Sequence, residues 1–305
     1  MSDTYATWLI ADIGATSSRC AVVNDGKYGK VSMFRNDDVA SLEDMLSACL
    51  AECSERPAHC ALAVAAPISG DNVVMSNRDW AFSVQSVQAL GLERVEIIND
   101  FHAIAYALPH FDDQTREEIG TASRYRDGNI AVLGPGSGLG MAAWIAGTAA
   151  MTGEGGHITV SGRDDYEDSI IVSLRAEFGH CSAERILSGP GLVALHKAIH
   201  GTAPESSESI TENPDESHNR KTLQHFFRFL AYVAADLALI TGAYGGVYVA
   251  GGIVPACIGE LQRSDFRERF EDKNRYRNYM RGIPTWVITD PFPGLTGLQA
   301  YINRR

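Results

Sequence analysis

An Asn-Asp pair stands at a change of sequence pattern near position 100. A short β-branched apolar run over residues 95–98 ends at Asn99 and Asp100, and an apolar pattern with helical spacing then continues to Pro109. This order predicts strand, turn and helix. Ligands of open α/β sheets bind beyond the carboxyl ends of the strands, so both side chains are expected to be free there, and Asp100 can take a proton from a hydroxyl group. Asn and Asp are also favoured N-cap residues, and on this stretch alone capping is the better-supported alternative.

A second group of polar residues suits the recognition of a sugar. Residues 151–157 carry Glu154 and His157 on a backbone that three glycines allow to bend, and Glu184 precedes a glycine-proline turn. A sugar presents a ring of hydroxyls, so its site needs several carboxylates, amides or an imidazole directed at one point. Ordinary alternatives exist, since Glu154 can close a turn and His157 can be a structural histidine. Glu184 can instead form an ion pair with Arg185 on a helix surface.

A turn near the N-terminus has the features of a phosphate-binding loop. Two strand-like runs flank the join D-x-G-x-T, which contains Gly14, Ala15 and Thr16. Backbone amides at such a turn can hold phosphate oxygens, the threonine hydroxyl can add a bond, and Asp12 at the strand end can hold Mg²⁺ through water. A plain hairpin uses the same residue types, so the motif alone leaves both interpretations open.

The second half of the chain repeats this arrangement with a different sequence. A strand over 129–133 leads into a glycine-rich turn that contains Ser137 and Gly138, and a further strand over 247–250 is followed by Gly251 and Gly252. The other elements expected from the sequence pattern are strands at 8–12, 19–23, 30–35, 60–65, 139–145 and 285–288, an inserted hairpin at 72–76, and helices near 41–53, 83–90, 167–178, 191–200, 222–242 and from 295. Residues 202–219 lack an apolar period and are expected to form a solvated loop.

Two similar halves, each with one glycine turn, predict an α/β fold of two actin-like (ribonuclease H-like) domains with a nucleotide and sugar cleft between them. The small domain is expected to comprise residues 1–108 with 294–305, and the large domain residues 109–293. A length of 305 residues is enough for two domains that each bury a core.

The composition excludes some classes of protein. A net charge of −12 would repel a phosphate backbone, so nucleic acid is not an expected partner. No apolar run approaches the roughly 20 residues that a membrane helix needs, and the N-terminus lacks the pattern of a signal peptide, so a cytoplasmic location is expected. The six cysteines show no C-x-x-C pair, and all six are expected to be free thiols, mostly buried.

Several motifs resemble those of the bacterial glucokinase family in sequence and spacing. The resemblance covers nearly the whole chain, including a segment that runs from Phe270 to Pro284. The chain lacks the cysteine-rich zinc motif of the related repressor-kinase group. The matching phrases are Pro67-Ile68-Ser69-Gly70-Asp71, Ile98-Asn99-Asp100-Phe101, Gly136-Ser137-Gly138-Leu139-Gly140, Gly153-Glu154-Gly155-Gly156-His157, Ala183-Glu184-Arg185, Leu187-Ser188-Gly189-Pro190-Gly191 and Ala250-Gly251-Gly252-Ile253-Val254-Pro255.

The resemblance implies ATP-dependent phosphorylation of D-glucose at its 6-hydroxyl by a homodimer of hexokinase-like fold. Transferred by motif, Asp100 would be the catalytic base. Glucose hydroxyls would be bound by Asn99, Asp100, Glu154, His157 and Glu184. ATP phosphates would lie on the turns at Asp12, Gly14, Ala15, Thr16, Ser137 and Gly138, with adenosine near Gly251 and Gly252.

Two departures from the family pattern bear on nucleotide affinity. The first turn has Ala15 and Ser17 where a second glycine and an asparagine are common, and the second turn has Ser137 where threonine is usual. Two other functions fit the same fold. One is a non-catalytic sugar-sensing regulator, and the other is an actin-like filament or chaperone ATPase.

Overall fold

The structure is a computed structural model that describes residues 6–304 except 69, 76–77 and 123–126. Its internal contacts divide the chain into two compact units, one formed by Met1–His110 with Pro291–Arg305 and the other by Phe111–Asp290. Ser69 of the Pro67–Asp71 turn motif and Ser76 of the hairpin expected at 72–76 lie outside the described residues.

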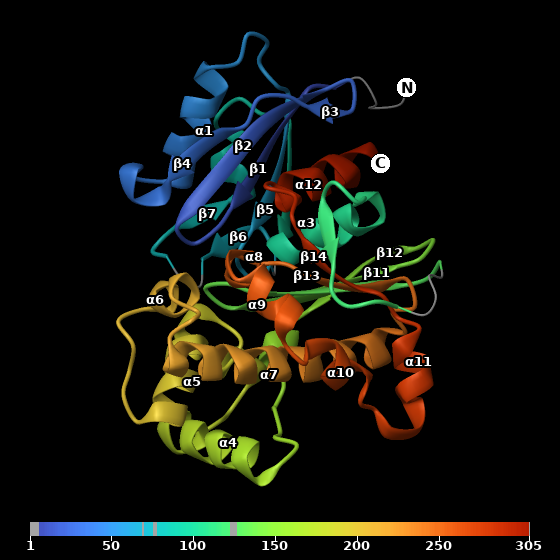
Figure 1. Cartoon of the computed structure of the whole chain (residues 1–305). Helices are drawn as coiled ribbons and strands as arrows, with labels where there is room; N and C mark the ends of the chain where they lie inside the picture. The colour runs from blue at the N-terminus through green and yellow to red at the C-terminus, as the bar shows by residue number, and fades with distance from the viewer. Residues whose placement is uncertain (1–5, 69, 76–77, 123–126, 305) are drawn as a thin grey trace. The chain divides into compact units, whose positions relative to one another are not determined.

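The first unit is built on a six-stranded mixed sheet (Figure 1). Across the sheet the strands are β3 (Lys27–Tyr28), β2 (Ser17–Asn24), β1 (Trp8–Ile13), β5 (His59–Val64) and β8 (Arg94–Asn99), with β4 (Ser32–Arg35) paired to β2. β1 is antiparallel to β2 and parallel to β5, and β5 is parallel to β8. The carboxyl ends of β1, β5 and β8 therefore meet at one edge, where the register aligns Ile13 with Val64 and Val64 with Asn99.

Helices cover both faces of this sheet. Alternate β1 residues contribute to two different cores, since Leu9 packs in a cluster with helix α1 (Leu42–Ala51) and Ile10 in a cluster with helix α12 (Pro293–Asn303). Helix α12 also packs on α3 (Asp100–Ala107), so closely that a Cβ atom on Gly297 would lie 1.9 Å from the carbonyl oxygen of Ala103. The remaining elements are the hairpin β6 (Asn72–Val74) and β7 (Ala81–Ser83), helix α2 (Val84–Gln88), and the 3-10 turns Asn36–Asp38 and Leu108–His110.

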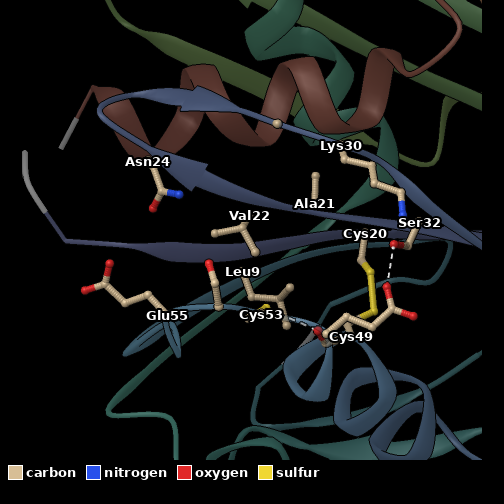
Figure 2. A pocket seen from close by; sticks show the side chains of 13 residues that line it. Leu9, Cys20, Ala21, Val22, Asn24, Lys30, Ser32, Cys49, Cys53 and Glu55 are labelled. Carbon is tan, nitrogen blue, oxygen red and sulfur yellow. Dashed lines mark hydrogen bonds between the residues drawn. A yellow bond between two sulfur atoms is a disulfide. The ribbon is translucent and has the colours of Figure 1, made fainter.

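The expectation of six free thiols is wrong. Cys20 on β2 and Cys49 on α1 form a disulfide, which Figure 2 shows as the yellow bond between strand and helix. Cys53, Cys60, Cys181 and Cys257 are free thiols. Sequence spacing could not reveal the pair, because the two cysteines are 29 residues apart and meet only when α1 packs on the sheet.

The second unit repeats the strand order of the first. Its sheet consists of β12 (Ala149–Gly153), β11 (Leu139–Ile145), β10 (Ile130–Pro135), β13 (Gly246–Val249), β14 (Thr285–Ile288) and β9 (Arg116–Glu118). β10 is antiparallel to β11 and parallel to β13, just as β1 is antiparallel to β2 and parallel to β5. The α/β class with a repeated actin-like unit, predicted from the sequence, is confirmed.

A long central helix organises the core of the second unit. Helix α7 (Ser217–Thr241) buries an aromatic group that includes Phe226, Phe227 and Phe229, and it packs against α5 (Gly189–His200) and α10 (Phe266–Glu271) (Figure 1). By length and composition alone α7 could span a membrane, but 67% of the relevant window is buried inside the unit, as in a core helix. The other helices are α4 (Asp165–Phe178), α5 (Gly189–His200), α6 (Ser207–Glu212), α8 (Ile253–Ala256), α9 (Ile258–Arg263), α10 (Phe266–Glu271) and α11 (Arg277–Arg281), with 3-10 turns at Gly155–His157, Ala183–Arg185 and Asn274–Tyr276.

The expectation of a solvated loop over residues 202–219 is also wrong. Helix α6 lies in this stretch, and the first residues of α7 belong to it. A reciprocal capping box between Ser206 and Ser209 starts α6, and the side chain of Ile210 is fully buried. One apolar residue in a short helix gives no detectable period, which explains the error.

Candidate active site

Two carboxylates meet at the strand edge of the first unit. Asp12 is the penultimate residue of β1, and Asp100 is the first residue of α3, directly after β8. The two parallel strands end at the same edge, and the negative charge of Asp12 acts on Asp100. The sheet topology therefore brings together two acidic groups that are 88 positions apart in sequence.

Asp100 has the protonation behaviour of a general base. Burial raises its pKa to about 7, and repulsion by the Asp12 carboxylate adds to that effect. Hydrogen bonds oppose the rise, among them the one that the Phe101 amide donates to Asp100 Oδ1 at 2.9 Å. A carboxyl group whose pKa lies near 7 can both accept and release a proton at neutral pH.

Asn99 caps the helix that follows it. Its Oδ1 accepts from the amides of Phe101 at 2.9 Å and His102 at 3.2 Å, and its Nδ2 donates to the Ala66 carbonyl at 3.2 Å. The expectation of a free side chain is wrong for Asn99, and the capping alternative is confirmed for it. Asn99 also donates a hydrogen bond to Asp100, which lowers the pKa of that carboxyl and orients it.

The first glycine turn is held from one side by a buried asparagine that the sequence did not single out. Asn36 Nδ2 donates to the carbonyls of Gly14 at 2.8 Å and Ala15 at 3.3 Å. The buried Ser18 hydroxyl donates to Asn36 Oδ1 at 2.8 Å and fixes the orientation of the amide. In a planar trans peptide the N–H points opposite to the carbonyl, so the amides of Ala15 and Thr16 point away from Asn36. Two adjacent amides that share a direction suit a phosphate oxygen.

Asp12 fits the role of an outer ligand for Mg²⁺. Burial raises its pKa, while the charge of Arg19 opposes that rise. A Cβ atom on Gly294, in the first turn of α12, would lie 2.6 Å from the Asp12 carboxyl carbon, so only glycine lets the helix approach this close. Within the described part of the chain there is no cluster of three His, Cys, Asp or Glu side chains able to hold a metal. Mg²⁺ commonly uses one or two carboxylates together with water and substrate phosphates, which matches a single carboxylate beside a phosphate turn.

In the second unit Glu184 lies against the second glycine turn. Its Oε2 accepts the Leu139 amide at 2.9 Å, and a Cβ atom on Gly138 would lie only 2.6 Å from the same oxygen. The alternative of an ion pair with Arg185 is wrong, because the Arg185 guanidinium lies over the Phe178 ring at 4.5 Å. Glu184 is thus positioned by the backbone of the turn rather than by a neighbouring cation.

The turn that carries Glu154 and His157 packs on the same strand. A Cβ atom on Gly156 would lie 2.2 Å from the carbonyl oxygen of Leu139, and one on Gly155 would lie 2.7 Å from the sulfur of Met141. Leu139 therefore contacts both the 154–157 turn and Glu184. Glu154 and His157 are exposed, and the His157 amide donates to the Glu154 carbonyl at 3.1 Å, so the turn is closed while its side chains remain accessible.

Gly251 and the start of α5 adjoin the second glycine turn. Gly251 has φ +84°, and a Cβ atom on it would lie 2.1 Å from the Pro135 carbonyl oxygen, so no other residue fits this approach. The Gly189 amide donates to the Gly136 carbonyl at 2.7 Å, and Ser188 caps α5 by accepting the Gly191 amide at 3.0 Å. Exposed Ser137 and Gly252 thus lie close to a helix N-terminus, where anions are stabilised.

Helix α6 belongs to this neighbourhood as well. The hydroxyl of Ser207 lies 3.3 Å from the position that a Cβ on Gly189 would occupy, and α6 also contacts α8, which follows Gly252. The sequence gave no functional assignment to this segment. The first unit therefore contains Asp12, the 14–16 turn, Asn99 and Asp100, and the second unit contains the other predicted site residues. Convergence of the two sets on one sugar stays a prediction.

Solved structures that share this fold include glucokinases. The crystal structure of a glucokinase from an Antarctic psychrotroph is similar with a TM-score of 0.86 and 32% identity, over 99% of this chain and 100% of that chain. The crystal structure of a ROK-family glucokinase from Streptomyces griseus in complex with glucose and AMPPNP shares the fold with a TM-score of 0.60 at 18% identity, over 97% of this chain and 99% of that chain. The similarity to the psychrotroph glucokinase, at 32% identity over nearly the whole chain, places this chain in the sugar-kinase class.

Sequence comparisons give the family within this class. The family model described as Glucokinase matches residues 9–305. A glucokinase of Aromatoleum aromaticum is 41% identical over 317 residues, covering 97% of this chain and 94% of the relative. A glucokinase of Photorhabdus laumondii is 38% identical over 315 residues, covering 97% of each. The chain belongs to the glucokinase family.

Proposed function

We propose that the protein transfers the γ-phosphoryl group of ATP to D-glucose and yields glucose 6-phosphate, the first step of glycolysis. Membership in the glucokinase family supports the substrates, and Asp100 is the single structural observation that carries the reaction. A carboxyl group with a pKa of about 7 beside an acidic neighbour and a phosphate-type turn has the chemistry that a hydroxyl nucleophile needs.

In this proposal Asp100 accepts the proton of the 6-hydroxyl as the sugar oxygen attacks the terminal phosphorus. Asn99 holds the Asp100 carboxylate in position, and the amides of Ala15 and Thr16 donate to phosphate oxygens. Mg²⁺, when bound, supplies positive charge that offsets the charge on the phosphates, and Asp12 would hold it through water. Because phosphoryl transfer requires little covalent chemistry from the protein, this positioning supplies most of the rate.

The other site residues are assigned to substrate binding. Glu154, His157 and Glu184 bind glucose hydroxyls, together with Asn99 and Asp100. Ser137 and Gly138 bind phosphate, and adenosine lies near Gly251 and Gly252. The glucokinase of Balamuthia mandrillaris was crystallised in complex with glucose, and that of Streptomyces griseus with glucose and AMPPNP. Those complexes support the choice of ligands for this chain.

We further propose that the enzyme is a cytoplasmic homodimer with the domain limits expected from the sequence, 1–108 with 294–305 and 109–293. Sugar binding is expected to bring the two domains together before phosphoryl transfer, because water would otherwise hydrolyse ATP at the same place. Small-angle scattering with and without glucose tests this step, and an unchanged radius of gyration contradicts it.

A coupled assay of ADP release across a panel of hexoses tests the proposed function. Strictly sugar-dependent turnover with glucose as the best substrate supports it. ADP release without sugar would instead indicate an actin-like ATPase. Glucose binding by calorimetry without turnover would instead indicate a sugar-sensing regulator.

A further inference from the structure

The first unit contains a pocket that is separate from the acidic pair. Its volume is about 310 Å³, which is at the lower end of the range for small-molecule sites. It lies where β2, the end of β3 and the C-terminal end of α1 meet (Figure 2). The lining residues that matter here are Cys20, Lys30, Ser32, Cys49, Glu52 and Cys53.

We propose that this pocket is a thiol-modification site, in which a small zwitterionic thiol binds beside the Cys20–Cys49 disulfide and opens it reversibly. The proposal does not depend on the proposed kinase activity, because every group involved belongs to the first unit. It assigns a role to the disulfide, which the glucokinase reaction does not require.

Access to the disulfide is limited to what fits into the pocket. The side chains of Cys20 and Cys49 are 2% and 4% exposed, yet both line the pocket. A large protein reductant therefore meets a covered bond, whereas a small thiol can reach it. In an oxidising compartment a buried disulfide is usually structural, but disulfides of cytoplasmic proteins are usually transient or redox-sensing.

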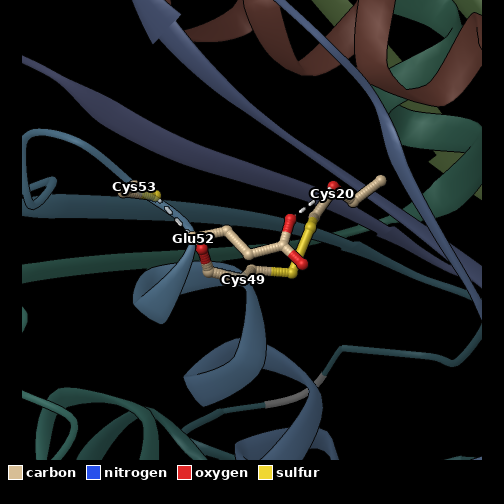
Figure 3. The surroundings of a disulfide bond; sticks show 5 residues. Cys20, Cys49, Glu52 and Cys53 are labelled. Carbon is tan, nitrogen blue, oxygen red and sulfur yellow. Dashed lines mark hydrogen bonds between the residues drawn. A yellow bond between two sulfur atoms is a disulfide. The ribbon is translucent and has the colours of Figure 1, made fainter.

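The charges around the pocket match a ligand that carries both an ammonium and a carboxylate group. Exposed Lys30 can pair with a carboxylate, and exposed Glu52 and Glu55 can pair with an ammonium group. Figure 3 shows Glu52 beside the disulfide, and its Oε2 accepts a weak hydrogen bond from the Ser32 hydroxyl at 3.4 Å. An uncharged thiol would gain none of these contacts, so the lining favours an amino-acid or small-peptide thiol.

Cys53 does not supply the attacking thiolate. Its sulfur donates to the Cys49 carbonyl at 3.1 Å, which ties it to the backbone of the same helix (Figure 3). Burial raises the pKa of the Cys53 thiol, with a smaller opposing effect of Arg56, so at neutral pH it stays protonated. Opening the Cys20–Cys49 bond therefore needs a thiol from solution.

The exchange takes two balanced steps. The incoming thiolate attacks Cys49 Sγ, the bond to Cys20 breaks, and the electron pair leaves on Cys20 Sγ, which takes a proton from water. A second thiolate then attacks the outer sulfur of the mixed disulfide and releases Cys49 as a thiolate together with the symmetrical disulfide of the ligand. Cys49 is the attacked residue because it lies in the last turns of α1, whereas Cys20 lies in a strand paired on both sides. The helix end has more freedom to make room for an adduct.

Opening the bond also affects the first glycine turn. Cys20 is three residues after Ser17, the first residue of β2, and β4 pairs with both residues through Ser32 and Arg35. The disulfide therefore anchors β2, the strand that follows the turn, to α1. Because the bond closes a chain segment of 29 residues, its loss should lower the melting temperature of the unit by roughly 5–10 °C.

Peptide mapping of the full chain tests the proposal without ATP or glucose. Protein purified without reductant is denatured, alkylated and digested, and the expected result is a cross-linked peptide pair through Cys20 and Cys49 with the other four cysteines alkylated. Reduced glutathione should remove the cross-link, and Cys20→Ser should accumulate a glutathione adduct on Cys49 when it is treated with glutathione disulfide. Absence of the cross-link, or an adduct on Cys53 in place of Cys49, overturns the proposal.

Rates of opening test the recognition of a zwitterion. Lys30→Ala should slow opening by glutathione about tenfold relative to opening by 2-mercaptoethanol, which carries no charge. Lys27→Ala removes a lysine of β3 that does not line the pocket, and it should leave this ratio unchanged. Equal ratios in the parent and both variants would show that thiol size alone determines access and would refute the proposed ligand class. Loss of kinase activity in any sample would bear on the proposed function only.

Discussion

Replacing Asp100 with asparagine should have opposite effects on stability and on turnover. Burial raises the pKa of Asp100 from 3.8 to about 7, so the folded protein binds a proton that the unfolded chain releases. The contribution of this group is fully present below pH 3.8 and is lost as the pH rises through about 7. Asparagine cannot ionise, so Asp100→Asn should be more stable than the parent at alkaline pH.

The size of the stability gain follows from the shift in the pKa of Asp100. Three pKa units at about 1.36 kcal/mol each correspond to roughly 4 kcal/mol. The side chain of Asp100 is partly accessible to solvent, which screens its charge, so we expect a gain of about 2 kcal/mol at pH 8.5 and about half of that gain at pH 5.5, which lies midway between the two pKa values. The expected loss of turnover is about 10²- to 10⁴-fold, as is typical when a general base is removed.

Thermal melts at the two pH values and steady-state kinetics of the same preparations provide the measurement. In the parent, kcat/KM should rise with pH through about 7, because Asp100 must be ionised to accept a proton. Asp112→Asn is the matched control: backbone hydrogen bonding lowers the pKa of this exposed carboxyl, so its removal should give no gain at pH 8.5. Turnover of Asp100→Asn within a few-fold of the parent, or an equal stability difference at both pH values, would refute the assignment.

Three further substitutions test the rest of the site. Asn36→Ala removes the side chain that holds two carbonyls of the first glycine turn, and it should raise the KM for ATP about tenfold with little change in the KM for glucose, as measured by the coupled assay. Glu184→Gln keeps the bond from the Leu139 amide but removes the charge, and it should raise the KM for glucose about tenfold; an unchanged KM would remove Glu184 from the sugar site. Gly251→Ala would place a methyl group 2.1 Å from the Pro135 carbonyl oxygen, so we expect a melting temperature several degrees lower and weaker ATP binding by calorimetry, whereas a melt like that of the parent would show that the turn can move.

Some of the fold and site was predictable from sequence because it depends on local pattern. An apolar run that ends at polar residues and is followed by a helical apolar period predicted the positions of β8 and α3. Glycine turns after apolar runs predicted both candidate phosphate loops. The repeat of strands and a glycine turn in the second half of the chain predicted the repeated actin-like unit, whereas the parallel and antiparallel pairings came from the structure.

The missed features depend on contacts between distant segments. Asn36 lies in a short 3-10 turn with no pattern around it, and only the folded unit brings its amide to the carbonyls of Gly14 and Ala15. The short edge strands β9 and β12 and the helices between residues 253 and 281 are too brief for a period to appear. Asn99 shows the opposite limit, since its residue type fits capping and substrate binding equally well, and the structure demonstrates the first.

The return of α12 to the first unit affects how the chain acquires its structure during synthesis. Leu295 and Leu298 are fully buried in the core beside β1, so the sheet of the first unit lacks part of its covering until residue 298 has left the ribosome. By then every residue of the second unit has been translated, which leaves it free to fold earlier. A truncated chain that ends at Asp290 should therefore protect the second unit from protease while the first remains open to cleavage.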